Sequence, residues 1–195
     1  MIKQVTPEAY FDSLSIAHKL DNILDGFKLE EIHLFSYFSS FLYCYAGNSI
    51  ATWEHRYIVA NGYPYSDTIN DAIIRHIQNG FFEEKGEYYV ITGRGADEFN
   101  KFKVLPTLIK REEILNAACT TTILIPYSQT LRALLNEPDF KKQVEIKNND
   151  WLDQNTFYNQ FKEISEAVGI KTQDLIIPAV TWINYINEKT KLKEV

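Results

Sequence analysis

Residues 72–102 read AIIRHIQNGFFEEKGEYYVITGRGADEFNKF, and the order of patterns in this stretch predicts a helix, a β-hairpin and another helix. The first helix begins before the stretch, because Ile69, Ile73 and Ile77 recur at every fourth position, as residues on one helix face do. Asn-Gly at 79–80 is typical of a helix end, so this helix is predicted to stop there.

The hairpin is predicted from two runs, FFEE at 81–84 and EYYVIT at 87–92, which flank a Lys-Gly pair. Their aromatic and β-branched residues are those that strands favour. Thr92 can accept a hydrogen bond from a first-turn N–H, so a helix is expected to follow. The glycines of GRG at 93–95 are interpreted as allowing close packing or an irregular helix start.

Helices are also predicted on both sides of this unit. Residues 29–47 are apolar on most sides, which predicts a helix buried in the centre of a domain. A shorter helix is expected at 51–62, and another within residues 1–27, interpreted as an N-terminal helical arm. The fold class is therefore mainly α with a small β-hairpin, divided into the arm, a central domain at 28–105 and a helical extension at 106–195.

Composition limits the possible functions. The chain has 195 residues, 45% hydrophobic and 24% charged, so it can form a packed core. Its formal charge of −6 disfavours nucleic acid unless cations gather on one face. Cys44 and Cys119 match no metal or redox spacing and are expected to be buried thiols in a reducing compartment. No apolar run approaches the roughly 20 residues of a membrane span, and no signal peptide is recognised, so a cytoplasmic location is expected.

The predicted order between 29 and 105, three helices, a hairpin and a helix, resembles the winged helix-turn-helix family. In that family the third helix ends with a hydrophobic residue and a glycine, and the wing leads through an aromatic strand end into a glycine-containing helix start. The matching residues here are Ile77, Gly80, Tyr89-Val90-Ile91-Thr92 and Gly93-Arg94-Gly95. The resemblance implies a winged-helix core, but fold alone does not determine activity.

DNA-binding members of the family place the third helix in the major groove and the wing on the backbone. The resemblance assigns these contacts to Thr68, Arg75 and Gln78, with Asp71 on the same face, and to Lys85 of the wing. Charge argues against this function, because residues 28–105 contain seven lysines and arginines against ten acidic residues. The cations available for phosphate contacts are therefore too few.

The charged wing is expected to contact another protein instead. The layout looks like the small middle component of bacterial three-component ABC systems, or an accessory subunit of an SMC-like anti-phage or anti-plasmid complex. This resemblance implies a non-enzymatic adaptor without a cofactor, docked on a larger ATPase and touching DNA weakly or through the complex. The alternative is a MarR- or PadR-like transcriptional regulator, and a homodimer is possible in either case. The interface candidates are Glu83, Glu84, Glu87 and Tyr88 on the wing, and Trp151 and Trp182, for which a core role is the other interpretation.

Signals for catalysis or metal binding are weak. The histidines, His18, His33, His55 and His76, have no metal-ligand spacing among them. Asp71 followed by the E-x-K of residues 83–85 resembles the ligand pattern of metal-dependent nucleases. At a hairpin tip these side chains are expected to be ordinary surface charges, so a nuclease is the least favoured hypothesis.

Overall fold

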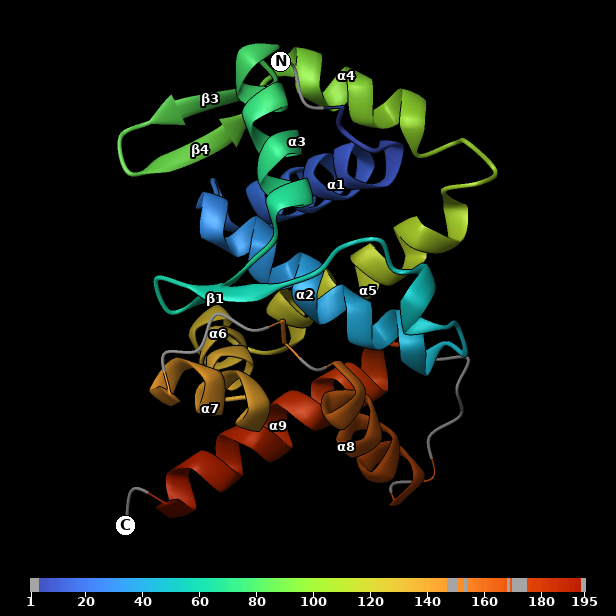
Figure 1. Ribbon diagram of the computed structural model, residues 1–195. Coiled ribbons are helices and arrows are strands. Elements are labelled where there is room, and N and C mark those ends of the chain that lie inside the picture. The colour runs from blue at the N-terminus through green and yellow to red at the C-terminus, as the bar shows by residue number, and fades with distance from the viewer. Residues whose placement is uncertain (1–3, 147–150, 153, 168, 170–174, 194–195) are drawn as a thin grey trace.

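A computed structural model describes residues 4–146, 151–152, 154–167, 169 and 175–193 (Figure 1). The fold is mainly α, with two small antiparallel hairpins, and this part of the fold-class prediction is confirmed. Within the described residues, no helix combines the length and apolar character that a membrane span requires. The helices are α1 (Pro7–Leu24), α2 (Leu29–Tyr45), α3 (Asp67–Gln78), α4 (Gly93–Phe102), α5 (Ile109–Leu124), α6 (Tyr127–Leu135), α7 (Pro138–Ile146), α8 (Gln154–Ala167) and α9 (Ile176–Lys193). The strands are β1 (Ile58–Ala60), β2 (Tyr63–Tyr65), β3 (Phe82–Lys85) and β4 (Tyr88–Ile91).

Helix α2 lies at the centre of the fold, as its all-round apolar sequence predicted (Figure 1). It packs against α1, α5, α8 and β2, so every side of the helix meets another element. Phe35, Phe38 and Phe41 are fully buried in the resulting core. Cys44 and Cys119 are free buried thiols, as predicted, and burial raises their pKa to about 11 and about 12.

Helix α1 is the helix expected within residues 1–27. Thr6 caps it by accepting a hydrogen bond from the Ala9 N–H at 3.2 Å. The helix is not peripheral, because it packs against α2, α3, α4, α5 and β4, and Phe11 and Leu14 are fully buried. Its small polar residues are buried as well, and this is why the sequence understated its role in the core.

The prediction of a helix at 51–62 is wrong. A single 3-10 turn, η1 (Ile50–Thr52), is followed by an extended segment and by the hairpin β1–β2, in which Ala60 pairs with Tyr63. The two turn residues, Asn61 and Gly62, have φ of 52° and 80°, which is the left-handed pair that a tight hairpin turn requires. Helix α3 is therefore preceded by a hairpin and not by a second helix.

The α3, β3–β4 and α4 unit is present as predicted, within a residue or two at each boundary. Thr92 caps α4 through the Gly95 N–H at 3.2 Å. A Cβ on Gly95 would lie 2.7 Å from the Phe81 carbonyl oxygen, so the predicted close packing applies to this glycine. Ile77 was expected on the buried stripe of α3, but it is 37% exposed and His76 is buried instead.

The C-terminal part consists of helices, as expected. Helix α9 packs against α5, α6 and α8, and joins the C-terminal helices to the central core. Pro126 immediately precedes α6 and Pro178 lies in the first turn of α9, both at positions that tolerate a missing N–H. The sequence KNND at 147–150 predicts a loop, but these residues lie outside those that the structure describes.

Candidate functional site

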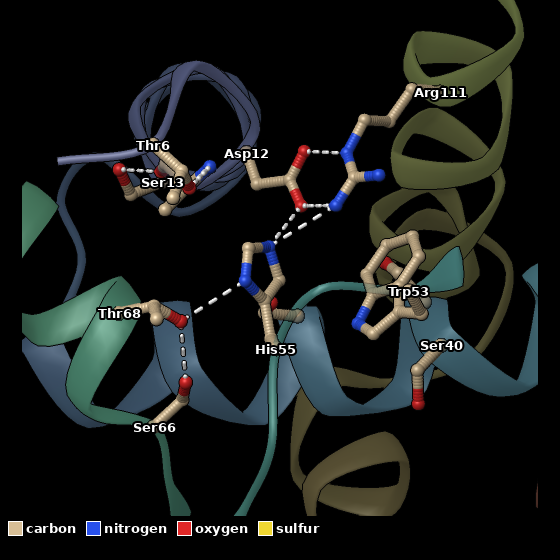
Figure 2. A network of polar contacts seen from close by, with 12 residues as sticks. Thr6, Asp12, Ser13, Ser40, Trp53, His55, Ser66, Thr68 and Arg111 are labelled. Atoms are coloured by element: carbon tan, nitrogen blue, oxygen red, sulfur yellow. Dashed lines mark hydrogen bonds and ion pairs between the residues drawn. The ribbon is translucent and has the colours of Figure 1, made fainter. Parts of the chain in front are cut away.

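A connected group of polar side chains is buried between α1, α5 and the segment before β1 (Figure 2). Arg111 on α5 donates from Nε to Asp12 Oδ1 at 2.5 Å and from Nη2 to Asp12 Oδ2 at 2.7 Å. His55 Nε2 lies 2.8 Å from Asp12 Oδ2. These three residues, the Asp12 network, are all buried, and Asp12 and Arg111 are 99 positions apart in the chain.

The Asp12 network continues to the start of α3. The other ring nitrogen of His55, Nδ1, lies 3.1 Å from the Thr68 hydroxyl, which in turn lies 2.9 Å from the Ser66 hydroxyl (Figure 2). The Ser66 N–H donates to His33 Nδ1 at 3.2 Å. The polar contacts therefore join α1, α2, α3 and α5 in one connected set.

A hydroxyl, an imidazole and a carboxylate in this order resemble the relay of a hydrolase. Here the imidazole and the carboxylate have no access to a substrate, because Asp12 is fully buried and His55 is only 1% exposed, although Thr68 itself is partly exposed. Burial raises the pKa of Asp12, but the ion pair with Arg111 and the hydrogen bond with His55 together outweigh it and hold that pKa below its usual range. We therefore assign the Asp12 network a structural role.

Arg111 also connects the network to an aromatic cluster. Its guanidinium lies 4.1 Å from the centre of the Trp53 ring, which suits a cation–π contact. Trp53 Nε1 donates to the Tyr57 hydroxyl at 3.2 Å, and that hydroxyl lies 2.7 Å from Ser36 Oγ on α2. Burial raises the pKa of Tyr57, so its hydroxyl stays protonated.

The histidines lie in separate places, and no group of three metal-binding side chains occurs among the residues described. His76 is fully buried, with Nε2 2.9 Å from the Ser13 hydroxyl and 3.0 Å from the Tyr10 carbonyl oxygen. Burial lowers the pKa of His33 and of His76 to about 4. His18 stacks on Phe99 at the surface of α1.

The β3–β4 hairpin, residues 82–91, is the wing. Its register pairs Lys85 with Tyr88 and Glu83 with Val90, so these side chains share the outer face. Tyr88 is 48% exposed, and Lys85 donates to the Glu83 carboxylate at 2.6 Å. On the inner face Phe82 is buried, while Glu84 at the tip and Glu87 in the turn are exposed.

The base of the wing is fixed to the core. Phe27, between α1 and α2, exchanges two backbone hydrogen bonds with Tyr89, at 2.9 and 2.8 Å. The Ile91 N–H donates to Asp21 of α1 at 3.1 Å. Lys28 lies over the Tyr88 ring at 5.5 Å. The wing is therefore held in one position while its outer face remains open to solvent.

The residues proposed for DNA contact do not form a basic surface. Thr68 is tied to His55, Arg75 and Asp71 are half-buried, and Gln78 is exposed at the end of α3. Lys85 is paired with Glu83. Sequence reasoning missed two exposed isoleucines of α3, Ile74 and Ile77, which their three-residue spacing places on one face.

The two tryptophans proposed for an interface have different environments. Trp182 is fully buried between Phe38 and Phe161, so it belongs to the core and offers no surface to a partner. For Trp182 the interface prediction is therefore wrong, and the core interpretation is confirmed. Trp151 is 55% exposed, and Arg56 lies 5.8 Å from its ring centre. Trp151 therefore remains an interface candidate.

Within the described residues, neither Asp71 nor the E-x-K residues belong to a group of three His, Cys, Asp or Glu side chains that could hold a metal. Lys85 and Glu83 pair with each other on the exposed wing, where side chains are accessible to water on most sides.

No protein-family model matches the chain, and the comparisons with curated proteins and with solved structures gave no match.

Proposed function

We propose that the chain is a non-enzymatic adaptor subunit that docks on a larger protein through its wing. One observation carries the proposal: a half-exposed tyrosine, Tyr88, shares the outer face of a firmly anchored hairpin with Glu83. Glu84 on the other face and Glu87 in the turn add exposed carboxylates close by. Aromatic residues supply much of the energy of protein interfaces, and surrounding charges supply selectivity. The wing combines both in a small area.

The fixed base favours binding because little conformational entropy is lost when a preorganised surface docks. The edges of the wing indicate how it binds. The outer edge of β3 carries the charged residues 83–85, which disfavour the addition of a further strand, and Phe27 pairs with the outer edge of β4. Docking is therefore through side chains.

Helix α3 packs against β3, and it carries two exposed isoleucines, Ile74 and Ile77. We include this apolar area in the proposed surface. An apolar and acidic surface of this kind fits a partner that presents apolar residues with lysine or arginine at the rim. The resemblance described above favours an SMC-like or ABC-type ATPase, in a bacterial system that acts against phages or plasmids.

A MarR- or PadR-like regulator is the second candidate, favoured by the sequence of α3, wing and α4. The acidic wing weighs against it, since phosphate contacts require several unpaired cations. The adaptor is expected to bind duplex DNA alone with dissociation constants no tighter than roughly 10⁻⁴–10⁻⁶ M.

The test is affinity capture from the native cells with two baits, the wild-type chain and a Tyr88→Ala/Glu84→Lys variant whose folding is checked by circular dichroism. An ATPase subunit recovered with the wild type and depleted with the variant supports the adaptor. Recovery of the chain alone, together with nanomolar and sequence-selective binding to its own upstream DNA, would establish the regulator instead.

A further inference from the structure

A cleft of about 340 Å³ lies between α1, α4 and α5. Phe99 and Cys119 form its buried floor, and Asn22, Asn116 and Thr120 contribute polar groups to its walls. The wing does not contribute to this cleft. In Figure 1 the wing projects to the left of the molecule, and the connection from α4 to α5 lies at the right.

Two lysines and a histidine surround the Phe99 ring. Lys19 and Lys103 each place Nζ 5.4 Å from the ring centre, and the His18 ring stacks on Phe99 with the ring centres 4.4 Å apart. Lys19 is paired with Glu112. Lys103 is exposed and forms no ion pair within the described segments, so one positive charge at the rim of the cleft has no counter-charge.

Apolar residues continue from the cleft onto the surface. Ile123, at the α5 end of the cleft, is 64% exposed. Val104 and Leu105 are also exposed and follow Lys103 directly in the chain. A small molecule would fill the cleft and leave these side chains in water, whereas a protein segment would cover them.

We propose that this cleft binds a segment of a partner protein that presents a large apolar side chain next to an aspartate or glutamate. The apolar side chain occupies the cleft over Phe99 and beside Ile123. The carboxylate pairs with Lys103, the open charge of the rim. The cleft shares no residue with the wing, so it is a second docking surface. If this proposal fails, the proposal for the wing remains intact.

The experiment is a selection of displayed random twelve-residue peptides on three immobilised chains: wild type, Lys103→Glu and Lys101→Glu. Lys101 is the matched control, because it lies two residues before Lys103 at the end of α4, its replacement changes the charge equally, and it pairs with Glu98 outside the cleft. We expect wild type and Lys101→Glu to enrich peptides with a large apolar residue beside Asp or Glu. The best such peptide should bind Lys103→Glu and Ile123→Ser at least about tenfold more weakly.

Three results would overturn the proposal. One is the absence of an acidic-apolar consensus, or a consensus that Lys103→Glu leaves unchanged. Another is self-association of the chain that Lys103→Glu abolishes, which would make a second copy the occupant. The third is binding of a small carboxylate such as benzoate or decanoate that is insensitive to Ile123→Ser, which would make the cleft a small-molecule site. Thermal melting must show that each variant is folded.

Discussion

Two ion pairs of this chain have almost the same length and very different surroundings. Arg111 Nε lies 2.5 Å from Asp12 Oδ1, and Lys85 Nζ lies 2.6 Å from Glu83 Oε1. The first pair is buried, with 9% and 0% of the side chains exposed, while more than half of each side chain in the second is exposed. Burial, and not distance, therefore decides what each pair does: the buried pair holds the fold together, and the exposed pair is available to a partner.

The largest expected effect concerns the buried pair. Arg111→Leu leaves the Asp12 carboxylate buried without its partner, which typically costs about 3 to 5 kcal/mol of unfolding free energy. Glu83→Gln, the matched change in the exposed pair, should cost less than about 1 kcal/mol. Urea denaturation of both variants measures the difference.

If Arg111→Leu does not fold, Arg111→Lys is the milder version, because it keeps the charge and loses the two-pronged contact with Asp12. The unfolding free energy of Arg111→Lys should be lower than that of wild type and of Glu83→Gln. It should be higher than that of Arg111→Leu. Equal losses for Arg111→Lys and Glu83→Gln would contradict the contrast between the two pairs.

The next effect is a pH dependence of the buried interior. Burial lowers the pKa of His33 and His76 to about 4, against about 6.5 in an unfolded chain. Between these values the unfolded state binds more protons, so stability falls as pH is lowered from about 6.5 towards about 4. His76→Gln should reduce the loss between pH 7 and pH 5 by about 2 kcal/mol relative to wild type.

Urea midpoints at pH 7, 6 and 5 give this difference. Between pH 7.5 and 8.5 the urea midpoints of the variant and the wild type should change in parallel, because His76 is neutral in both the folded and the unfolded chain. An identical pH dependence of the two proteins at acid pH would show that His76 titrates normally in the folded chain.

The wing and the buried Asp12 network also differ in how well they could be predicted from the sequence. The α3, wing and α4 unit was predicted because its signals are local: a four-residue spacing, a glycine in a tight turn and a threonine cap. The Asp12 network was missed, because its residues come from α1, the segment before β1 and α5, and only the folded chain brings them together. Before folding, Asp12 is one polar residue in a helix pattern.

The remaining errors have physical causes as well. A helix was predicted at 51–62, although the Asn61-Gly62 pair at the end of this segment is the strongest short-range signal for a two-residue hairpin turn. Ile77 continues the four-residue spacing of α3 but lies at the end of the helix, where the core no longer covers it. Burial of Trp182 depends on the packing of α9 against α8, the helix before it, and against α2, which lies far from it in sequence.

On the wing, the first prediction is a loss of affinity. Tyr88→Ala should weaken binding to the captured partner at least about tenfold, equivalent to about 1.4 kcal/mol, since a buried interface tyrosine is commonly worth more than that. Stability should change little, because Tyr88 is about half exposed in the free chain. Calorimetric titration measures the affinity.

Trp151→Ala is the control, since it removes another exposed aromatic side chain outside the wing. It should leave the affinity unchanged. If Trp151→Ala weakens binding and Tyr88→Ala does not, the docking surface lies beside Trp151 and Arg56 instead of on the wing.

The smallest effect expected is on the rate of association. Glu84 is exposed at the tip of the wing, where a rim charge steers a partner with lysine or arginine at its own rim. Glu84→Lys should therefore slow association several-fold at low salt and change the dissociation rate much less, because rim charges act mainly before the complex forms. Salt screens the interaction, so the difference from wild type should shrink as ionic strength rises towards about 0.5 M.

Glu113→Lys on α5 makes the same change in net charge away from the wing and is the matched control. If both variants slow association equally, the net charge of the chain steers the partner and the wing has no special role; if only Glu84→Lys does so, the tip of the wing faces the partner as it approaches.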